Sequence, residues 1–307
     1  MSKATREAYG EELQQLIQEN DKIVVLDADL AGSTKSAMAG AVCPDRFFDM
    51  GIAEADMIGV SAGLAASGYI PFASSFAMFA TGRVWEQIRN SVAYPHLNVK
   101  VVGSHSGIAV GEDGVTHQAI EDIAIMRVIN GLDLFVPCDQ YETKAVIDYV
   151  AASKNPCYVR LGRSAVDDIY EDKNIDILKV HELTHGDDAV LFACGLEVQQ
   201  SLAAAKLLEA EGIKVTVVDV CAINPCDKEG IVALLNKFEN VFTVEEHSIV
   251  GGLGSMVCEI AAESCPRKIT RIGMKSFGES ADWKTLLHAY QLDGEGIANQ
   301  VKAGLNK

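Results

Sequence analysis

Short apolar segments that alternate with helical patterns constrain the fold of this sequence more than any other feature. Buried strands are predicted over residues 22–26, 69–73, 99–103, 134–137 and 156–161, and helical patterns separate them. Parallel strands need long crossover connections of this kind, which antiparallel hairpins do not. The sequence therefore predicts an α/β fold whose first domain, residues 1–165, is built on a parallel sheet.

A second series of the same kind follows a charged, aperiodic segment. We expect a linker over residues 166–187 and a second α/β domain over 188–307, so that each domain is a mainly parallel sheet flanked by helices. The GGLG at 251–254 opens a helix but lacks the full glycine spacing of a dinucleotide-binding fingerprint, and a packing turn is predicted there.

Charge and composition restrict the function classes. The formal net charge of −17 argues against a nucleic-acid partner, which needs a basic surface. The chain starts without the apolar core of a signal peptide and has no apolar run of roughly 18 residues, so we expect a cytoplasmic protein without a membrane segment. Eight cysteines occur without CxxC or zinc-type spacing, which indicates reduced core thiols, Cys138 among them, and no metal site.

The segment Ser104–Gln118 is the least ordinary stretch of the chain. It places His105, His117, Glu112 and Asp113, together with three glycines, between a predicted strand and a predicted helix. Glycine permits backbone turns that bring the two histidines back toward each other. A structural loop seldom needs so many titratable groups, so this segment is predicted to be functional.

Glu54 stands near the first turn of a helix of small and apolar residues. Five neighbours predict a packed, dry surrounding: Ile52, Ala53, Ala55, Ile58 and Val60. A carboxylate there is costly unless it is paired. Two interpretations stay open from these residues alone, which are stabilisation by the helix dipole and a carboxylate reserved for a cofactor nitrogen.

Other candidates have ordinary structural explanations as well. A helix is predicted to start at Ser74 or Ser75, and it would place Phe76 and Phe79 on one face, where such pairs are usually core. Arg6 lies in the first turn of a helix, where a cation opposes the macrodipole. Asp29 follows a strand end and Arg163 stands just past another, which is where α/β sheets place ligands.

Taken together, GIAEADM, SFAMF and GEDGVTHQ, with RLGRS after them, resemble transketolase. The resemblance covers essentially the whole chain, but only the carboxyl-terminal part of a full-length transketolase. It implies a pyrimidine-binding domain followed by the smaller C-terminal domain.

This resemblance implies thiamine diphosphate as cofactor. Glu54 matches the carboxylate that bonds the aminopyrimidine ring nitrogen and favours the imino tautomer, which then removes the thiazolium C2 proton. A low dielectric would strengthen that bond. Phe76 and Phe79 match the aromatic wall on which the pyrimidine stacks. Asp29 and Leu30 match residues that line the cofactor region.

The resemblance also implies a sugar-phosphate pocket. His105 and His117 match histidines near the reacting carbon, which act as proton donors and hydrogen-bond partners. Asp113 matches the acid that reads a substrate hydroxyl. The set that holds the acceptor phosphate is matched by Arg6, Ser33, His105 and Arg163.

One feature of the family has no counterpart here. The family holds the cofactor's diphosphate through a divalent cation on a GDG motif followed by an asparagine, and the nearest segment, 186–188, lacks the second glycine. The chain therefore resembles one subunit of a split transketolase. An N-terminal partner subunit is expected to hold Mg²⁺ or Ca²⁺, in an assembly with two copies of each chain.

The implied reaction is two-carbon ketol transfer from a ketose phosphate to an aldose phosphate, as in the pentose phosphate pathway. A transketolase-like enzyme for a modified sugar, such as a sulfosugar, is a close alternative. Deoxyxylulose-phosphate synthase and the β subunit of oxo-acid dehydrogenases share the Glu helix but are not expected to carry GEDGVTHQ. A regulatory or scaffold subunit is the non-enzyme alternative; it would have lost Glu54 or the histidines, and both are present.

Overall fold

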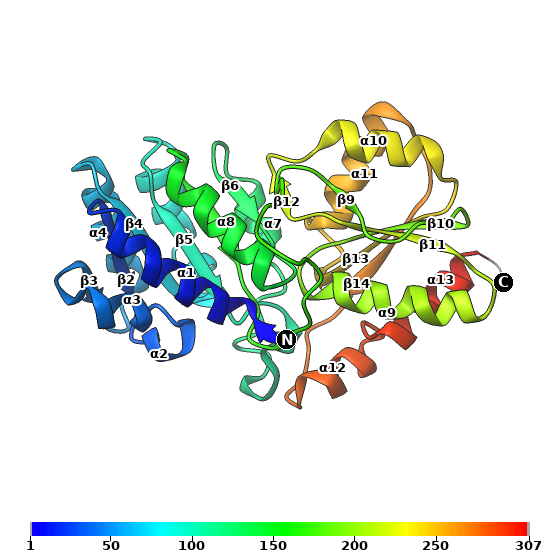
Figure 1. Cartoon of the computed structure of the whole chain (residues 1–307), viewed down its shortest axis with the longest axis horizontal. Helices are drawn as coiled ribbons and strands as arrows, with labels where there is room; N and C mark the ends of the chain where they lie inside the picture. Colours follow the sequence, from blue (N-terminus) through cyan, green and yellow to red (C-terminus); the bar gives the residue numbers. More distant parts are fainter. Residues whose placement is uncertain (1, 306–307) are drawn as a thin grey trace.

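The structure, a computed structural model, describes residues 2–305 and consists of two α/β units side by side (Figure 1). The first unit is built on a seven-stranded sheet in which every neighbouring pair is parallel except the pair at the β12 edge. The strand order is β12 (Ala222–Asn224), β6 (Asp133–Phe135), β7 (Cys157–Arg160), β5 (Lys100–Ser104), β4 (Ile70–Phe76), β2 (Ile23–Asp27) and β3 (Phe47–Asp49).

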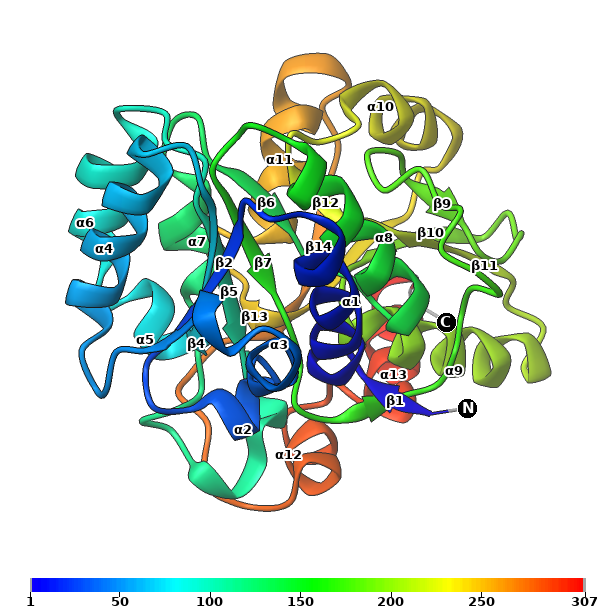
Figure 2. The same cartoon turned by 60° about the vertical axis from the view of Figure 1, so that its left-hand side comes forward.

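Helices cover both faces of this sheet because successive residues of each strand point to opposite sides. Ile23 and Val25 pack in one core with the helices on one face, whereas Val24 and Leu26 pack in another core on the opposite face. The first face carries α1 (Thr5–Glu19), α3 (Ala37–Val42) and α8 (Gln140–Ala152). The second carries α4 (Glu54–Ala66), α5 (Ala77–Thr81), α6 (Trp85–Gln87), the π-helical turn η2 (Ile88–Ala93) and α7 (Asp122–Arg127) (Figure 2).

The second unit repeats the plan on a five-stranded sheet with one antiparallel edge strand, β9. Its strand order is β14 (Ile269–Met274), β13 (Val241–Ser248), β10 (Ala189–Ala193), β11 (Val215–Asp219) and β9 (His181–Glu182). One face is covered by α10 (Lys228–Lys237) and α11 (Leu253–Ser264), and the other by α9 (Leu196–Ala210), α12 (Trp283–Ala289) and α13 (Gly294–Gly304).

The two units are joined by more than a linker. Strand β12 follows β11 in the chain but completes the sheet of the first unit, where it pairs with β6. One hydrophobic core also contains residues of both units, such as Leu134 and Val136 from the first and Phe192 and Val218 from the second. The units therefore form one packed body.

The predicted linker over 166–187 contains residues that pair in β-sheets. Strand β8 (Ala165–Val166) pairs with β1 (Lys3–Ala4) at the junction of the units, and β9 pairs with β11. Each end of the segment is thus tied to a different part of the fold.

The α/β class with two mainly parallel sheets is confirmed, and two local predictions are wrong. Ser74 and Ser75 do not cap a helix, because β4 continues through them to Phe76 and buries both fully. The helix expected near residues 119–130 is only α7, Asp122–Arg127. Within residues 2–305 no helix is both long and apolar enough to cross a membrane.

Candidate active site

The candidate residues gather where strands of the first sheet end. Strands β4 and β5 are adjacent and parallel, and Phe76 pairs in register with Ser104 at their carboxyl ends. His105 comes immediately after that pair, so it reaches the same edge as Phe76. Carboxyl ends of parallel strands are the usual ligand positions in α/β sheets.

Four rings form the centre of the site. His105 stacks on Phe76 with 3.9 Å between ring centroids and 27° between planes. His117 presents its edge to Phe79 at 5.2 Å and to Phe76 at 6.2 Å, and the two phenyl rings lie 6.2 Å apart at 19°. The structure therefore brings together both histidines and both phenylalanines.

His105 is held neutral by its surroundings. Burial lowers the pKa of His105 to about 3, and the positive charges of Arg6, Arg163 and Lys35 act in the same direction. Arg6 Nη1 lies 3.4 Å from His105 Nε2, and Ser104 Oγ lies 2.9 Å from Nδ1. Since a guanidinium can only donate, Nε2 is the acceptor, and Nδ1 carries the proton and donates to Ser104.

Two arginines make a positive region in this acidic chain. Arg6 Nη1 donates to the backbone oxygen of Ser33 at 2.7 Å, in addition to its contact with His105. Arg163 donates to the Glu112 carboxylate at 2.9 Å and to the backbone oxygen of Val110. Burial, followed by the charge of Arg163, lowers the pKa of Arg6, opposed by the nearby Glu7. Such a region suits an anionic group of a ligand.

Asp29 and Leu30 lie in a turn that Asp27 organises. The buried Asp27 accepts the Leu30 N–H at 2.7 Å and the hydroxyls of Thr34 and Ser36 at 2.7 and 2.8 Å. Burial nevertheless raises the pKa of Asp27. Asp29 is exposed and adopts a left-handed backbone with φ of 64°. Asp27 thus stabilises the turn in which Asp29 and Leu30 lie.

Glu54 opens α4, as expected, but its surroundings differ from the prediction. Arg83 Nη1 donates to both of its carboxylate oxygens, at 3.0 and 2.8 Å. The expected packed, dry surrounding is found only in part. Glu54 is 2% exposed and Ile58 is fully buried, whereas Ile52, just before α4, is 77% exposed and Val60, on α4, is 37% exposed because nothing in this chain covers them.

The second unit holds the loop that carries the histidines. Gln118 Nε2 donates to the backbone oxygen of Glu279 at 2.8 Å, and Ser280 Oγ donates to that of Glu112 at 2.6 Å. Glu246 accepts the Ala109 N–H. Asp113, at the end of the 3₁₀ turn η3 (Ile108–Asp113), is exposed, and its contact with a substrate hydroxyl stays a prediction.

Gly107 explains how closely this loop approaches the second unit. Its φ is +71°, and a Cβ atom at this position would collide with the Glu246 carboxyl group. Side chains other than glycine meet both backbone strain and a clash there.

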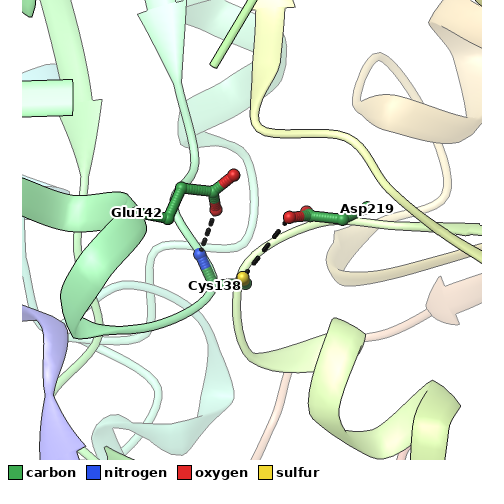
Figure 3. Close-up of side chains that lie close together, drawn as sticks. All are labelled: Cys138, Glu142 and Asp219. Carbon is green, nitrogen blue, oxygen red and sulfur yellow. Dashed lines mark hydrogen bonds between the residues drawn. The ribbon is translucent and has the colours of Figure 1, made fainter. Parts of the chain in front are cut away.

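A second polar cluster lies at the junction of the units (Figure 3). The Cys138 thiol donates to Asp219 Oδ2 at 3.4 Å, the Tyr170 hydroxyl donates to the same oxygen at 2.8 Å, and Glu142 accepts the Cys138 N–H at 2.7 Å. Burial raises the pKa of Glu142 well above its usual value, and the neighbouring Asp219 carboxyl acts in the same direction.

The ligand atoms of Cys138, Glu142 and Asp219 lie within 4.8 Å of one another, a grouping that the cysteine spacing did not reveal. Burial raises the pKa of all three groups, which favours their protonated, uncharged forms. We interpret this cluster as a set of polar contacts that joins the two units.

The GGLG turn is a packing turn, as predicted. Glu245 accepts the N–H groups of Leu253 and Gly254 at 2.7 and 2.8 Å, so a side chain of the protein already occupies the start of α11. A Cβ at Gly252 would collide with the same carboxylate. The Glu245 carboxylate therefore leaves no room for a phosphate at the start of α11.

Two functional-site features were missed from the sequence. Arg83 lies in a segment predicted as continuous helix, although its place four residues after Phe79 fits the observed stacking of its guanidinium on that ring at 4.7 Å. The buried Arg160 donates to Asp122 at 2.7 Å and to the Glu246 backbone at 2.9 Å. These hydrogen bonds connect distant parts of the chain, since Arg160 and Glu246 are more than 80 positions apart. Local sequence patterns therefore could not predict them.

The donor set fits one end of thiamine diphosphate. Glu54 offers a carboxylate and Phe76 and Phe79 offer apolar ring faces, which suit an aminopyrimidine. Within residues 2–305, the metal-binding side chains that gather in one place are those of the Cys138 cluster, which shares no residue with this site. The residues present therefore fit the pyrimidine, whereas a diphosphate–metal group has no matching ligand cluster among the described residues.

Two family models match most of the chain. Residues 1–168 match the transketolase pyrimidine-binding domain, and residues 178–297 match the transketolase C-terminal domain. A Methanocaldococcus jannaschii protein provisionally named as a transketolase C-terminal section is 47% identical over an alignment of 311 positions that covers 99% of this chain and 97% of the relative.

Two further similarities concern a relative and a solved structure. The 6-deoxy-6-sulfo-D-fructose transketolase subunit of a Clostridium species is 40% identical over 276 residues, 89% of this chain and 86% of the relative. A structure described as a split-gene transketolase, an inactive β4 tetramer, superposes with a TM-score of 0.89 at 44% identity and covers 99% of this chain and 98% of its own. The chain belongs to the transketolase family and carries its pyrimidine-binding and C-terminal domains.

Proposed function

We propose that this chain is the C-terminal subunit of a thiamine-diphosphate-dependent transketolase that moves a two-carbon ketol unit between sugar phosphates. The observation that carries the proposal is the meeting of Glu54, the two phenylalanines and the two histidines at one sheet edge. When bound, thiamine diphosphate supplies the electron sink for breaking a carbon–carbon bond next to a carbonyl.

The roles of the cofactor-facing residues follow from their chemistry. Glu54 holds the ring nitrogen of the pyrimidine, and Phe76 and Phe79 give its face an apolar wall. Asp29 and Leu30 line the same region beside the turn that Asp27 organises.

The substrate-facing residues act on hydroxyl groups and on an anionic tail. His105 is neutral, so it works as a hydrogen-bond partner for a substrate oxygen rather than as an imidazolium. His117 acts beside it, and Asp113 accepts a substrate hydroxyl. Arg6, Arg163 and the neighbourhood of Ser33 bind the anionic tail through charge-assisted hydrogen bonds.

An N-terminal partner subunit would hold the diphosphate through Mg²⁺ or Ca²⁺, in an assembly with two copies of each chain. The absence of a suitable ligand cluster within residues 2–305, outside the Cys138 group, supports this division. The similarity to a split-gene transketolase supports it as well.

A sulfosugar transketolase is the second candidate. The relative named as a 6-deoxy-6-sulfo-D-fructose transketolase subunit favours it, since a sulfonate and a phosphate both suit two arginines. A scaffold subunit without catalysis is disfavoured because Glu54, His105 and His117 are all present.

Reconstitution tests the proposal. The chain is mixed with the N-terminal subunit from the same source, thiamine diphosphate and Mg²⁺, and ketol transfer is assayed with sugar-phosphate and sulfosugar donors. We expect transfer by the pair and none by the chain alone. Micromolar cofactor binding and transfer by the isolated chain would overturn the split-enzyme proposal, and activity with sulfosugars only would select the second candidate.

A further inference from the structure

The contacts of Arg83 place one side chain on two of the candidate cofactor-binding groups at once. Its Nη1 donates to both oxygens of Glu54, at 3.0 and 2.8 Å, and its Cζ lies 4.7 Å from the centroid of Phe79. Stacked aromatic rings lie about 4.5–7 Å apart, so the guanidinium takes the position over Phe79 that a planar ring would take.

We propose that Arg83 is a placeholder for the cofactor's aminopyrimidine: it occupies Glu54 and the face of Phe79 in the free chain and is displaced when the cofactor binds. The inference rests on the proposed function, because it assumes that these two side chains receive the pyrimidine. It adds a residue that none of the sequence motifs indicated.

The burial of Glu54 explains why a placeholder is needed. The Glu54 side chain is 3% exposed, whereas that of Arg83 is 50% exposed. A buried carboxylate without a partner is strongly unfavourable. Arg83 supplies the missing charge while the site is empty, and it does so from the solvent side.

The same exposure explains why the placeholder can leave. Glu54 is buried, but the half-exposed Arg83 guanidinium is already partly solvated, and water and salt screen its charge, so its release costs less than breaking a fully buried pair. Arg83 also lies in the irregular turn between α5 and α6, between the exposed Gly82 and the buried Val84. Val84 fixes the backbone, and the Arg83 side chain can rotate into solvent without disturbing a helix.

Competition of this kind has a distinct salt dependence. Salt weakens the Arg83–Glu54 pair and leaves a neutral ligand unaffected. Binding of a neutral aminopyrimidine should therefore become tighter as salt is added. If Arg83 did not compete with the ligand for Glu54, the affinity of the neutral pyrimidine would not change with salt.

The experiment uses 4-amino-5-hydroxymethyl-2-methylpyrimidine, the uncharged pyrimidine part of thiamine, titrated into the isolated full chain and followed by NMR. Arg83→Gln removes the charge, Arg83→Lys keeps it, and Arg89→Gln is the matched control, since Arg89 is exposed and contacts Asn90 instead. Far-ultraviolet circular dichroism checks that each variant is folded.

We expect Arg83→Gln to bind the pyrimidine about two- to fivefold tighter than the parent, as loss of a weak exposed ion pair predicts. The parent and Arg83→Lys should gain affinity between low and high salt, and Arg83→Gln should not. The placeholder hypothesis would be wrong if Arg83→Gln bound the pyrimidine with unchanged or lower affinity. It would also be wrong if the pyrimidine affinity of the parent did not change with salt.

A parallel titration of thiamine diphosphate and Mg²⁺ into the reconstituted pair separates the two proposals. If the parent pair does not bind the cofactor, the proposed function fails. If the pair binds it and Arg83→Gln shows no gain for the pyrimidine, only the placeholder fails. A salt-dependent parent supports the placeholder even if Arg83→Gln does not fold.

Discussion

At the scale of single residues, His105 owes its protonation state to its neighbours. Burial and the charges of Arg6 and Arg163 lower the pKa of His105, so Arg6→Ala should raise it, although burial will keep it below the usual value. Nitrogen-15 NMR of the ring measures this directly between pH 3 and pH 7. The exposed His288, whose pKa Asp293 raises, is the internal reference and should not move.

Glu54 is expected to be essential for chemistry but not for folding. Glu54→Gln keeps the shape and one hydrogen bond, but the amide cannot share a proton with the pyrimidine nitrogen. We expect turnover by the reconstituted pair to be nearly abolished, with the thermal midpoint of the chain retained. The exchange of the cofactor C2 proton, followed by NMR, is the readout, and exchange at the parent rate would remove Glu54 from the mechanism.

Arg163 should act on the anionic tail of the substrate. Loss of a charge-assisted hydrogen bond of about 1.5–3 kcal/mol predicts that Arg163→Ala raises KM for phosphorylated acceptors by roughly tenfold or more. Short aldehydes without phosphate are the control and should be little affected. An equal loss for both kinds of acceptor would show a structural role, for instance in holding Glu112.

At the scale of elements, the loop of residues 104–118 depends on one glycine. Gly107→Ala would introduce strain at positive φ and a clash with Glu246, and we expect a loss of about 1–3 kcal/mol in the free energy of unfolding. Gly59→Ala is the matched control, since Gly59 lies in α4 with open space around it and alanine is the better helix former. Denaturant unfolding should show opposite signs for the two substitutions.

Strand positions could be predicted from the sequence because buried parallel strands are continuous apolar segments. The strand predicted over 99–103 is observed as Lys100–Ser104. Ser74 and Ser75 misled the prediction since capping residues are also small enough to be buried in a strand. Strand β12 was not foreseen, because its partner β6 belongs to the other unit.

The candidate site, like the fold, could be predicted from the sequence only in part. Motifs indicated the candidate ligand-binding residues, and the structure brings Arg6, Ser33, His105, Phe76 and Phe79 to one place. Arg83 was not predicted as a site residue, because its position depends on a break in the helix after Thr81. The dry surrounding of Glu54 was predicted only in part, because Ile52 and Val60 face outward in the free chain while Ile58 is buried.

At the scale of the whole molecule, two buried carboxyl groups of β13 make stability depend on pH. Burial raises the pKa of Glu245 and of Glu246 to about 7, compared with 4.5 for an ordinary glutamate. The folded state then binds more protons than the unfolded state between these values, so this contribution to stability is full below about pH 4.5. It falls as the pH rises and is lost above about pH 7.

Glu246→Gln should remove its part of that dependence. The parent is expected to lose about 3 kcal/mol relative to the variant between pH 4.5 and pH 7, from 1.36 kcal/mol per unit of pKa. Thermal or urea unfolding of both proteins across this range measures the difference. Parallel stability curves would show that the Glu246 carboxyl is ionised in the folded chain.

The buried thiols have a consequence for the life of the protein under oxidative stress. Burial raises the pKa of Cys138, Cys157, Cys194 and Cys221, so the reactive thiolate is scarce in each, and the same packing keeps peroxide away. Damage should begin instead at the half-buried Cys43 and Cys265, because burial also raises the pKa of the other two half-buried thiols, Cys226 and Cys258. Neither Cys43 nor Cys265 belongs to the ring cluster, so the first oxidised sulfurs should leave those four rings unchanged.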